Sequence, residues 1–205
     1  MRLRALLVVV LAAGAFAGGA GANGDPASDV LPFYTVYFAG QNPDATPSGR
    51  DLLFLTRQAM KKKFPIRVAV IYQPSDLGLI QSLWKQPQSY ARFLGKELIN
   101  FGRYHGTLLV SMPNGYGVFG PGATAPSRRA LSSLASPGTV GLDRFGAATV
   151  SAVQALATAS GHALPAPPKR GSGTPAWVIL LAALTGAVVL AAAVFLGLRR
   201  WLTRA

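Results

Sequence analysis

The sequence predicts an α/β fold: a βαβ sandwich with a mostly parallel central sheet and an antiparallel edge hairpin, plus one C-terminal transmembrane helix. Two aliphatic runs, 66–72 (IRVAVIY) and 107–112 (TLLVSM), are typical of strands buried on both faces of a parallel sheet. Segments with helical periodicity lie between and after them, which is the alternation that parallel strands require.

The first half of the domain supplies a strand and a helix before the run at 66–72. Residues 32–38 (PFYTVYF) are aromatic and β-branched, which favours a short strand. Ser48 and Asp51 have the spacing of a capping box, so a helix is expected to begin at Ser48. Its apolar stripe is Leu52, Leu55, Ala59 and Met60, and Lys61, Lys62 and Lys63 close it before Pro65.

The second half supplies two more helices and the hairpin. Pro87 begins a helix whose apolar stripe is Tyr90, Leu94, Leu98 and Phe101. The strand at 107–112 runs into the tight turn 113–115 (PNG) and returns at 116–119. A closing helix is expected at 143–158, with Phe145, Thr149, Ala152 and Leu156 on one stripe.

Both ends of the chain indicate membrane targeting. Residues 1–22 have a basic start, a 12-residue apolar run and a final Ala-Gly-Ala, which is typical of a cleaved secretory signal. Residues 176–198 are 23 residues without a charge, and as a helix they would extend about 34 Å, enough to cross a bilayer. Arg199, Arg200 and Arg204 follow at once and predict a cytoplasmic tail at 199–205.

These segments predict a single-pass protein of the cell membrane. The domain at 23–160 would lie outside the membrane, and a Pro/Gly/Ser-rich linker at 161–175 would join it to the span. The expected partners are the membrane and another protein of the bacterial cell envelope. Nucleic acid is not expected as a partner in that location.

Composition narrows the chemistry further. The 205 residues contain no cysteine and two histidines, which excludes disulfides, thiolate metal sites and a cysteine nucleophile. The net charge is +13, from 20 basic and 7 acidic residues. Five of the 20 basic residues lie in the predicted signal and tail, so 23–175 keeps 15 basic and 7 acidic residues, a charge of +8.

Motifs that could support catalysis lack their structural context. Gly115, Gly117 and Gly120 match G-x-G-x-x-G, but they follow a turn and run through a strand, so nucleotide binding is not expected. Ser82 and Lys85 match S-x-x-K without the accompanying motifs of that enzyme class. No catalytic residues are predicted.

Two polar residues follow neighbouring strands at the end where open α/β sheets bind ligands. Asp76 follows the strand at 66–72, where the alternative is a helix N-cap. Asn114 follows the strand at 107–112, where the alternative is a residue of the tight turn. Lys61, Lys62 and Lys63 form a basic surface that would bind anionic lipid or wall polymer, or else complement the dipole of their helix.

The segment from Arg67 to Gly117 resembles the TPM-type domain, a family of extracytoplasmic modules. The matching residues are Tyr90-Ala91, Leu108-Leu109-Val110 and Gly115-Tyr116-Gly117, and the segment 142–145 (LDRF) is similar to the start of the family's last helix. The resemblance covers about residues 33–160. It implies a membrane-anchored βαβ sandwich, divalent cation binding such as calcium in some members, acid phosphatase activity in some, and assembly or repair roles in others.

Three functions are therefore open. The leading hypothesis is a non-catalytic, membrane-tethered binding or scaffold module of the cell envelope. The second is a weak metal-dependent phosphatase of the TPM type, in which Asp76 with Asp143 or Asp51 would hold the ion and Asn114 would orient the ligand. The third is electrostatic attachment to anionic wall polymer or lipid.

Overall fold

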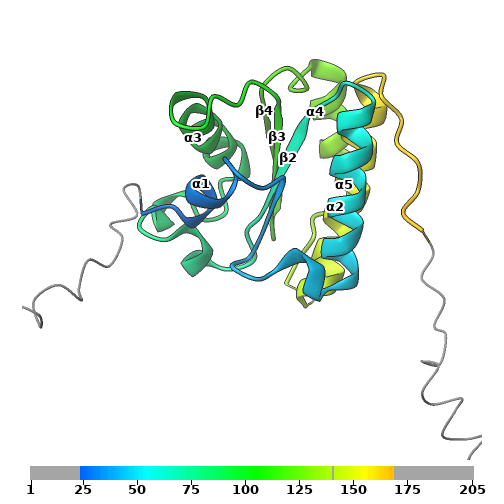
Figure 1. Cartoon of the computed structure of the whole chain (residues 1–205). Coiled ribbons are helices and arrows are strands. Elements are labelled where there is room, and N and C mark those ends of the chain that lie inside the picture. The colour runs from blue at the N-terminus through cyan, green and yellow to red at the C-terminus, as the bar shows by residue number, and fades with distance from the viewer. Residues whose placement is uncertain (1–23, 140, 169–205) are drawn as a thin grey trace, which may run out of the picture. The chain divides into compact units, whose positions relative to one another are not determined.

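A four-stranded sheet lies between two layers of helices. The computed structural model describes residues 24–139 and 141–168. Helices α1 and α3 cover one face of the sheet, and α2, α4 and α5 cover the other (Figure 1). The helices are α1 (Pro26–Val30), α2 (Pro47–Lys61), α3 (Pro87–Asn100), α4 (Ala125–Ser132) and α5 (Leu142–Ala159).

The sheet confirms the predicted mixed α/β architecture. Its strands are β1 (Val36–Phe38), β2 (Ile66–Val70), β3 (Thr107–Met112) and β4 (Gly115–Phe119), in the order β1-β2-β3-β4. The first three are parallel, and β4 pairs antiparallel with β3 across the two-residue turn Pro113-Asn114. Helices α2 and α3 connect successive parallel strands on opposite faces. Because both connections step the same way across the sheet, one has the left-handed sense that such crossovers rarely adopt.

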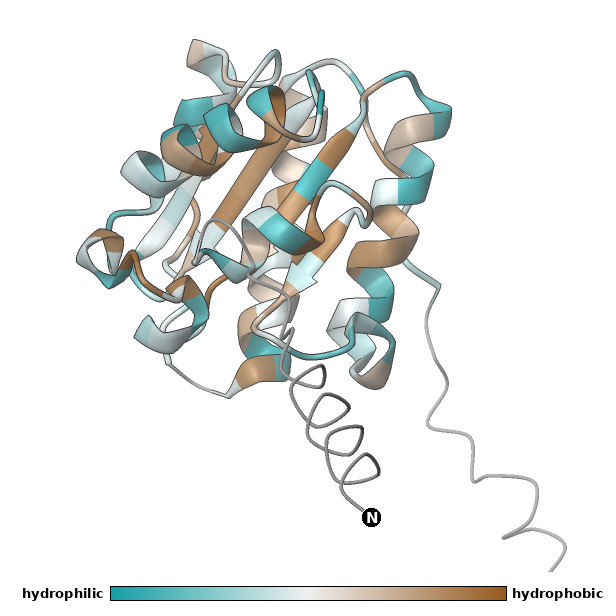
Figure 2. Cartoon of the chain, turned by 60° about the vertical axis from the view of Figure 1, so that its left-hand side comes forward, coloured by the Kyte–Doolittle hydropathy of each residue, from teal (hydrophilic) through white to brown (hydrophobic). Residues whose placement is uncertain are grey.

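The core is divided by the sheet into two apolar layers. Alternate residues of β2 point to opposite sides: Val68 and Val70 pack with α2 and α5, whereas Ala69 packs with α1 and α3. All six residues of β3 are buried. Figure 2 shows hydrophobic strands at the centre and helices whose hydrophilic residues lie on their outer sides. Burial on both faces explains why β2 and β3 read as continuous apolar runs.

Two predicted starts of elements are wrong. The strand expected at 32–38 is only Val36–Phe38, because the N–H groups of Phe33 and Tyr34 bond back to Val30 and prolong the turn after α1. The helix expected from Ser48 begins earlier, at Pro47, with Thr46 as its N-cap. The Thr46 side chain accepts from the Gly49 N–H at 3.0 Å.

Two short helices, α1 and α4, had no counterpart in the sequence analysis. Each begins with a capping residue followed by proline: Asp25-Pro26 in α1 and Thr124-Ala125-Pro126 in α4. Within the described part of the chain, no helix has both the length and the apolarity needed to span a membrane. The predicted signal (1–22), span (176–198) and tail (199–205) all lie outside the described residues.

Three 3₁₀ turns join the main elements at one end of the sheet or close to it. They are η1 (Pro43–Ala45), η2 (Pro74–Leu77) and η3 (Gln81–Leu83). The described part of the predicted linker, 161–168, begins packed against the domain. The ring of His162 stacks on Phe64 at 5.0 Å between centroids, and Leu164 contacts the core.

Candidate functional site

The Asp76 carboxylate holds the loop that follows β2. Its Oδ2 accepts from the N–H groups of Tyr72 and Gln73, at 2.8 and 2.9 Å, and the side chain is 6% exposed. This is the capping geometry that was the alternative to ligand binding. The bonds also explain why β2 ends at Val70, two residues before the predicted boundary.

Asp143 and Asn114 bond two other segments. The Asp143 Oδ1 accepts from the Ser48 N–H at 3.0 Å, so a carboxylate from α5 caps the first turn of α2. The Asn114 amide nitrogen donates to the Lys85 carbonyl at 2.6 Å. The structure thus gives each of the three predicted crevice residues a separate backbone partner.

The described residues contain no group of three or more His, Cys, Asp or Glu that could hold a metal ion. Asn114 lines a cavity in whose wall neither Asp76 nor Asp143 takes part. The divalent cation and the phosphatase activity stay predictions from the family resemblance. A cation site would need more protein ligands than the carboxylates of Asp76 and Asp143, and each of these already accepts from backbone N–H groups.

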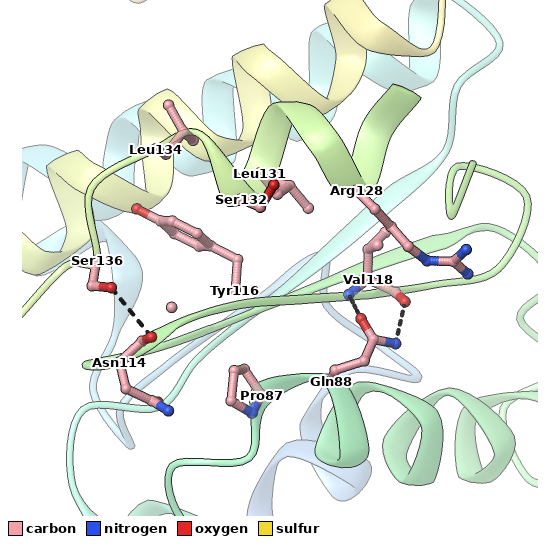
Figure 3. A pocket seen from close by; sticks show the side chains of 11 residues that line it. Pro87, Gln88, Asn114, Tyr116, Val118, Arg128, Leu131, Ser132, Leu134 and Ser136 are labelled. Atoms are coloured by element: carbon pink, nitrogen blue, oxygen red, sulfur yellow. Dashed lines mark hydrogen bonds between the residues drawn. The ribbon is translucent and has the colours of Figure 1, made fainter. Parts of the chain in front are cut away.

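The cavity beside Asn114 lies along the free edge of β4, and we call it the edge pocket. It measures about 320 Å³. Figure 3 shows Asn114 and Ser136 at one end, Tyr116 in the middle and Arg128 beyond Val118 at the other end. Its walls come from the first turn of α3, from β4, and from α4 with the loop that follows: Pro87, Gln88, Asn114, Gly115, Tyr116, Val118, Arg128, Leu131, Ser132, Leu134 and Ser136.

Gln88 closes one part of the β4 edge. Its side-chain amide accepts from the Val118 N–H at 3.1 Å and donates to the Val118 carbonyl at 3.0 Å (Figure 3). The amide group therefore imitates the backbone of a neighbouring strand at Val118. This contact needs α3 to approach β4 closely, and a side chain at Gly117 would collide with the Pro87 carbonyl.

Tyr116 is the position of this edge that Gln88 leaves open. In an antiparallel strand the N–H and C=O of one residue point to the same side, and alternate residues share that side. Because Val118 points both groups away from β3, Tyr116 also points its N–H and C=O outward, toward the edge pocket. The Tyr116 ring is anchored through its hydroxyl near the Ala135 and Ala148 carbonyls, at 3.3 and 3.4 Å.

The opposite edge of the sheet is arranged similarly but is more apolar. The Thr35 carbonyl and the Ala39 N–H form hydrogen bonds with β2, so the N–H and C=O groups of Val36 and Phe38 point away from β2. The Phe38 carbonyl accepts from the Gln41 N–H at 2.8 Å. A cavity of about 470 Å³ lies beside Val36. Its other walls include Tyr34, Val30 of α1 and Leu53 of α2.

The sequence analysis missed Gln88, Arg128 and the buried pair of Asp25 and Tyr90. The Tyr90 hydroxyl donates to Asp25 Oδ1 at 2.8 Å, while Oδ2 is buried without a hydrogen bond. Burial raises the pKa of Asp25 to about 6, although the Tyr90 hydrogen bond opposes that shift. No local pattern announces these contacts, because each joins residues from different elements.

Comparisons with known protein families, with curated proteins and with solved structures found no match. The resemblance to the TPM-type domain therefore stays a prediction from the motifs in this sequence.

Proposed function

We propose that the protein is a membrane-tethered binding module of the cell envelope. Its domain, 23–160, lies outside the membrane, with residues 1–22 as a cleaved signal, 176–198 as the span and 199–205 in the cytoplasm. Its ligand is an extended segment of another envelope protein, which binds in the edge pocket. In this proposal the fold is of the TPM type and performs no catalysis.

The observation that carries this proposal is the outward-facing backbone of Tyr116 in the edge pocket. An extended peptide can add to an exposed strand edge through its own N–H and C=O groups, and side-chain pockets then select its sequence. Gln88 confines such pairing to the Tyr116 position. Asn114, Ser132 and Ser136 supply polar contacts, and Leu131 and Leu134 supply apolar ones.

Electrostatics favours a peptide with a negatively charged group near the Val118 end. Arg128 lines the edge pocket and is exposed. Acidic residues are absent from the pocket walls, so a carboxylate there would meet only a positive side chain. This charge preference is part of the proposal.

Site-specific photo-crosslinking in intact envelopes tests the proposal. Ser132 lines the edge pocket, whereas the adjacent Ser133, which is also exposed, does not line it. A benzophenone side chain at Ser132 should give one discrete protein adduct, and the same group at Ser133 should not. The adduct should disappear in the variant Ser136→Trp, which fills the other end of the pocket.

Two results would contradict it. One is equal crosslinking from positions 132 and 133. The other is the absence of an adduct from Ser132 together with phosphate-ester turnover that Asp76→Asn abolishes, since this would favour the phosphatase hypothesis.

A further inference from the structure

Four segments meet at the end of the sheet where the parallel strands begin, and we call this the basic end. They are 31–35, 61–65, 101–106 and 160–164. Arg67 donates to the Pro32 carbonyl at 3.1 Å, and the Tyr104 hydroxyl donates to the Pro65 carbonyl at 3.0 Å. Lys62 donates to the Ala163 carbonyl, which joins the fourth segment to the others.

Most of the large exposed apolar side chains lie in or beside this end. Among the described residues there are five such side chains, and four of them are here: Phe33 (83% exposed), Phe101 (70%), Tyr34 (66%) and Met60 (58%). The fifth, Leu79, lies in the loop after η2, at the other end of the sheet. Exposed aromatic side chains gathered in one region indicate a surface that contacts something apolar.

The charged side chains of the basic end are all positive. Lys61, Lys62, Lys63 and Arg103 are exposed, and the four segments contain no Asp or Glu. The basic residues lie close to exposed apolar ones in the chain: Lys61 follows Met60, and Arg103 follows Phe101 by two residues. This combination of cations and aromatic rings is typical of surfaces that enter the headgroup region of an anionic bilayer.

Two of these cations have a left-handed backbone conformation. Helices α2, α3 and α5 each end near a residue with positive φ: Lys63 (58°), Arg103 (49°) and Gly161 (79°). Glycine is the residue best suited to that conformation, and α5 uses it. The first two helices have a basic residue there despite its conformational cost.

The competing explanation is that these cations complement the helix dipoles. Basic residues near a helix C-terminus stabilise it modestly. That explanation accounts for Lys61 and Lys63 but not for the exposed rings of Phe33, Tyr34 and Phe101, which contribute nothing to a dipole.

We propose that the basic end lies directly against the anionic surface of the membrane that holds the protein. Phe33, Tyr34 and Phe101 enter the headgroup region, and the lysines and Arg103 contact lipid phosphates. After Leu164, which packs on the core, 11 residues remain before the predicted span at 176, and they reach at most about 40 Å. The tether therefore keeps the basic end close to the lipid surface.

This inference rests on the membrane tether of the proposed function but not on the edge pocket. Hydrogen exchange of the full chain in lipid nanodiscs tests it. Segments 61–65 and 101–106 should exchange more slowly in discs with 30% phosphatidylglycerol than in pure phosphatidylcholine discs. The turn at 113–116 should exchange equally in both, and 1 M salt should remove the difference at the basic end.

Glycine substitutions separate lipid contact from structural roles. A cation near an anionic surface contributes about five-fold to the docked population, from the usual energy per basic residue. Lys63→Gly should therefore reduce the ratio of docked to undocked protein about five-fold, and adding Arg103→Gly should reduce it about 25-fold. Lys85→Gly is the matched control, because Lys85 has a φ of 59° at the other end of the sheet.

Three outcomes would overturn the inference: equal exchange in the two disc types, an equal loss of protection in Lys63→Gly and Lys85→Gly, or failure of the chain to insert into discs. The last would also remove the tether of the proposed function. Protection of the basic end without crosslinking from Ser132 would instead remove only the peptide-binding part. Lys63→Gly should leave crosslinking from Ser132 unchanged.

Discussion

The two ends of the sheet use their charged residues in opposite ways. At the end that carries the β3–β4 turn, which we call the hairpin end, Asp76 and Asp143 accept from backbone N–H groups. Asp25, beside the start of α3, is buried against Tyr90. At the basic end, Lys61, Lys63 and Arg103 are exposed.

This difference shows why position in the fold is a poor guide to function here. Open α/β sheets place ligands at the carboxyl ends of their strands, which is the hairpin end in this domain. The acids there are occupied in holding loops and helix ends together. The exposed cations Lys61, Lys63 and Arg103 lie at the other end of the sheet. Substitutions at three acids and at one cation test this difference.

The largest effect on stability is expected from Asp76→Ala. It removes a charged acceptor from the N–H groups of Tyr72 and Gln73 and should lower the free energy of unfolding by about 4 kcal/mol. Urea denaturation measures this. The control is Asp44→Ala, whose exposed carboxylate should be dispensable. Equal stability of the two variants would show that the acids of the hairpin end are not structural.

Asp25 should make the stability depend on pH in an unusual direction. Its pKa is about 6 in the folded protein against 3.8 as the unperturbed value, so the folded state binds the proton more tightly. The stabilisation is complete below pH 3.8 and is lost as the pH rises through 6. Its full size is about 3 kcal/mol, from 1.36 kcal/mol per pKa unit.

The variant Asp25→Asn isolates this contribution from the other acids. Asparagine does not ionise, so the difference in unfolding free energy between variant and wild type should shift by about 2.4 kcal/mol between pH 4 and pH 7.5, in favour of the variant at high pH. Thermal unfolding across that pH range measures it. A constant difference would mean that Asp25 does not titrate within the folded protein in this range.

A smaller effect is expected from Asp143→Ala. The substitution removes the carboxylate that caps α2 from another helix and should cost about 1 kcal/mol. Asp143→Asn keeps an acceptor oxygen and should recover part of that loss. If Asp143→Ala instead leaves the stability unchanged and removes binding of a calcium ion detected by calorimetry, the metal hypothesis gains the support it now lacks.

The smallest effect on stability is expected from Lys63→Gly. Glycine relieves the positive φ of 58° but loses the favourable contact with the α2 dipole, so the net change should be within about 1 kcal/mol. Urea denaturation of Lys63→Gly and Lys85→Gly should give similar small changes. A large loss for Lys63→Gly alone would make the basic end a structural feature like the acids of the hairpin end.

The elements that could be predicted from the sequence are those with strong local signals. Strands β2 and β3 have continuous apolar runs, α3 begins at its proline, and the turn before Gly115 marks the hairpin. The capping role of Asp76 was one of two hypotheses that its position allowed, the other being ligand binding. The start of α2 was misplaced, since Ser48 fits a capping box but packs instead inside the first turn against Gly146.

The features that could not be predicted all depend on contacts between distant segments. Gln88 bonds Val118, and Tyr90 bonds Asp25, over 30 and 65 residues of chain respectively. The basic end exists only because parallel strands bring residues 33, 63 and 103 to one place. Lys61, Lys62 and Lys63 were visible as a basic run, but the aromatic side chains that share their surface were not.

Depth measurement by electron paramagnetic resonance tests the central claim most directly. The chain has no cysteine, so a single cysteine in place of Phe101 or Leu79 takes up one spin label. Both side chains are exposed and apolar, and they lie at opposite ends of the sheet. In the full chain in anionic nanodiscs, the label at 101 should be accessible to oxygen and shielded from a polar nickel reagent. The label at 79 should be as accessible to the nickel reagent as a label in water. Equal accessibility at the two positions would contradict the account.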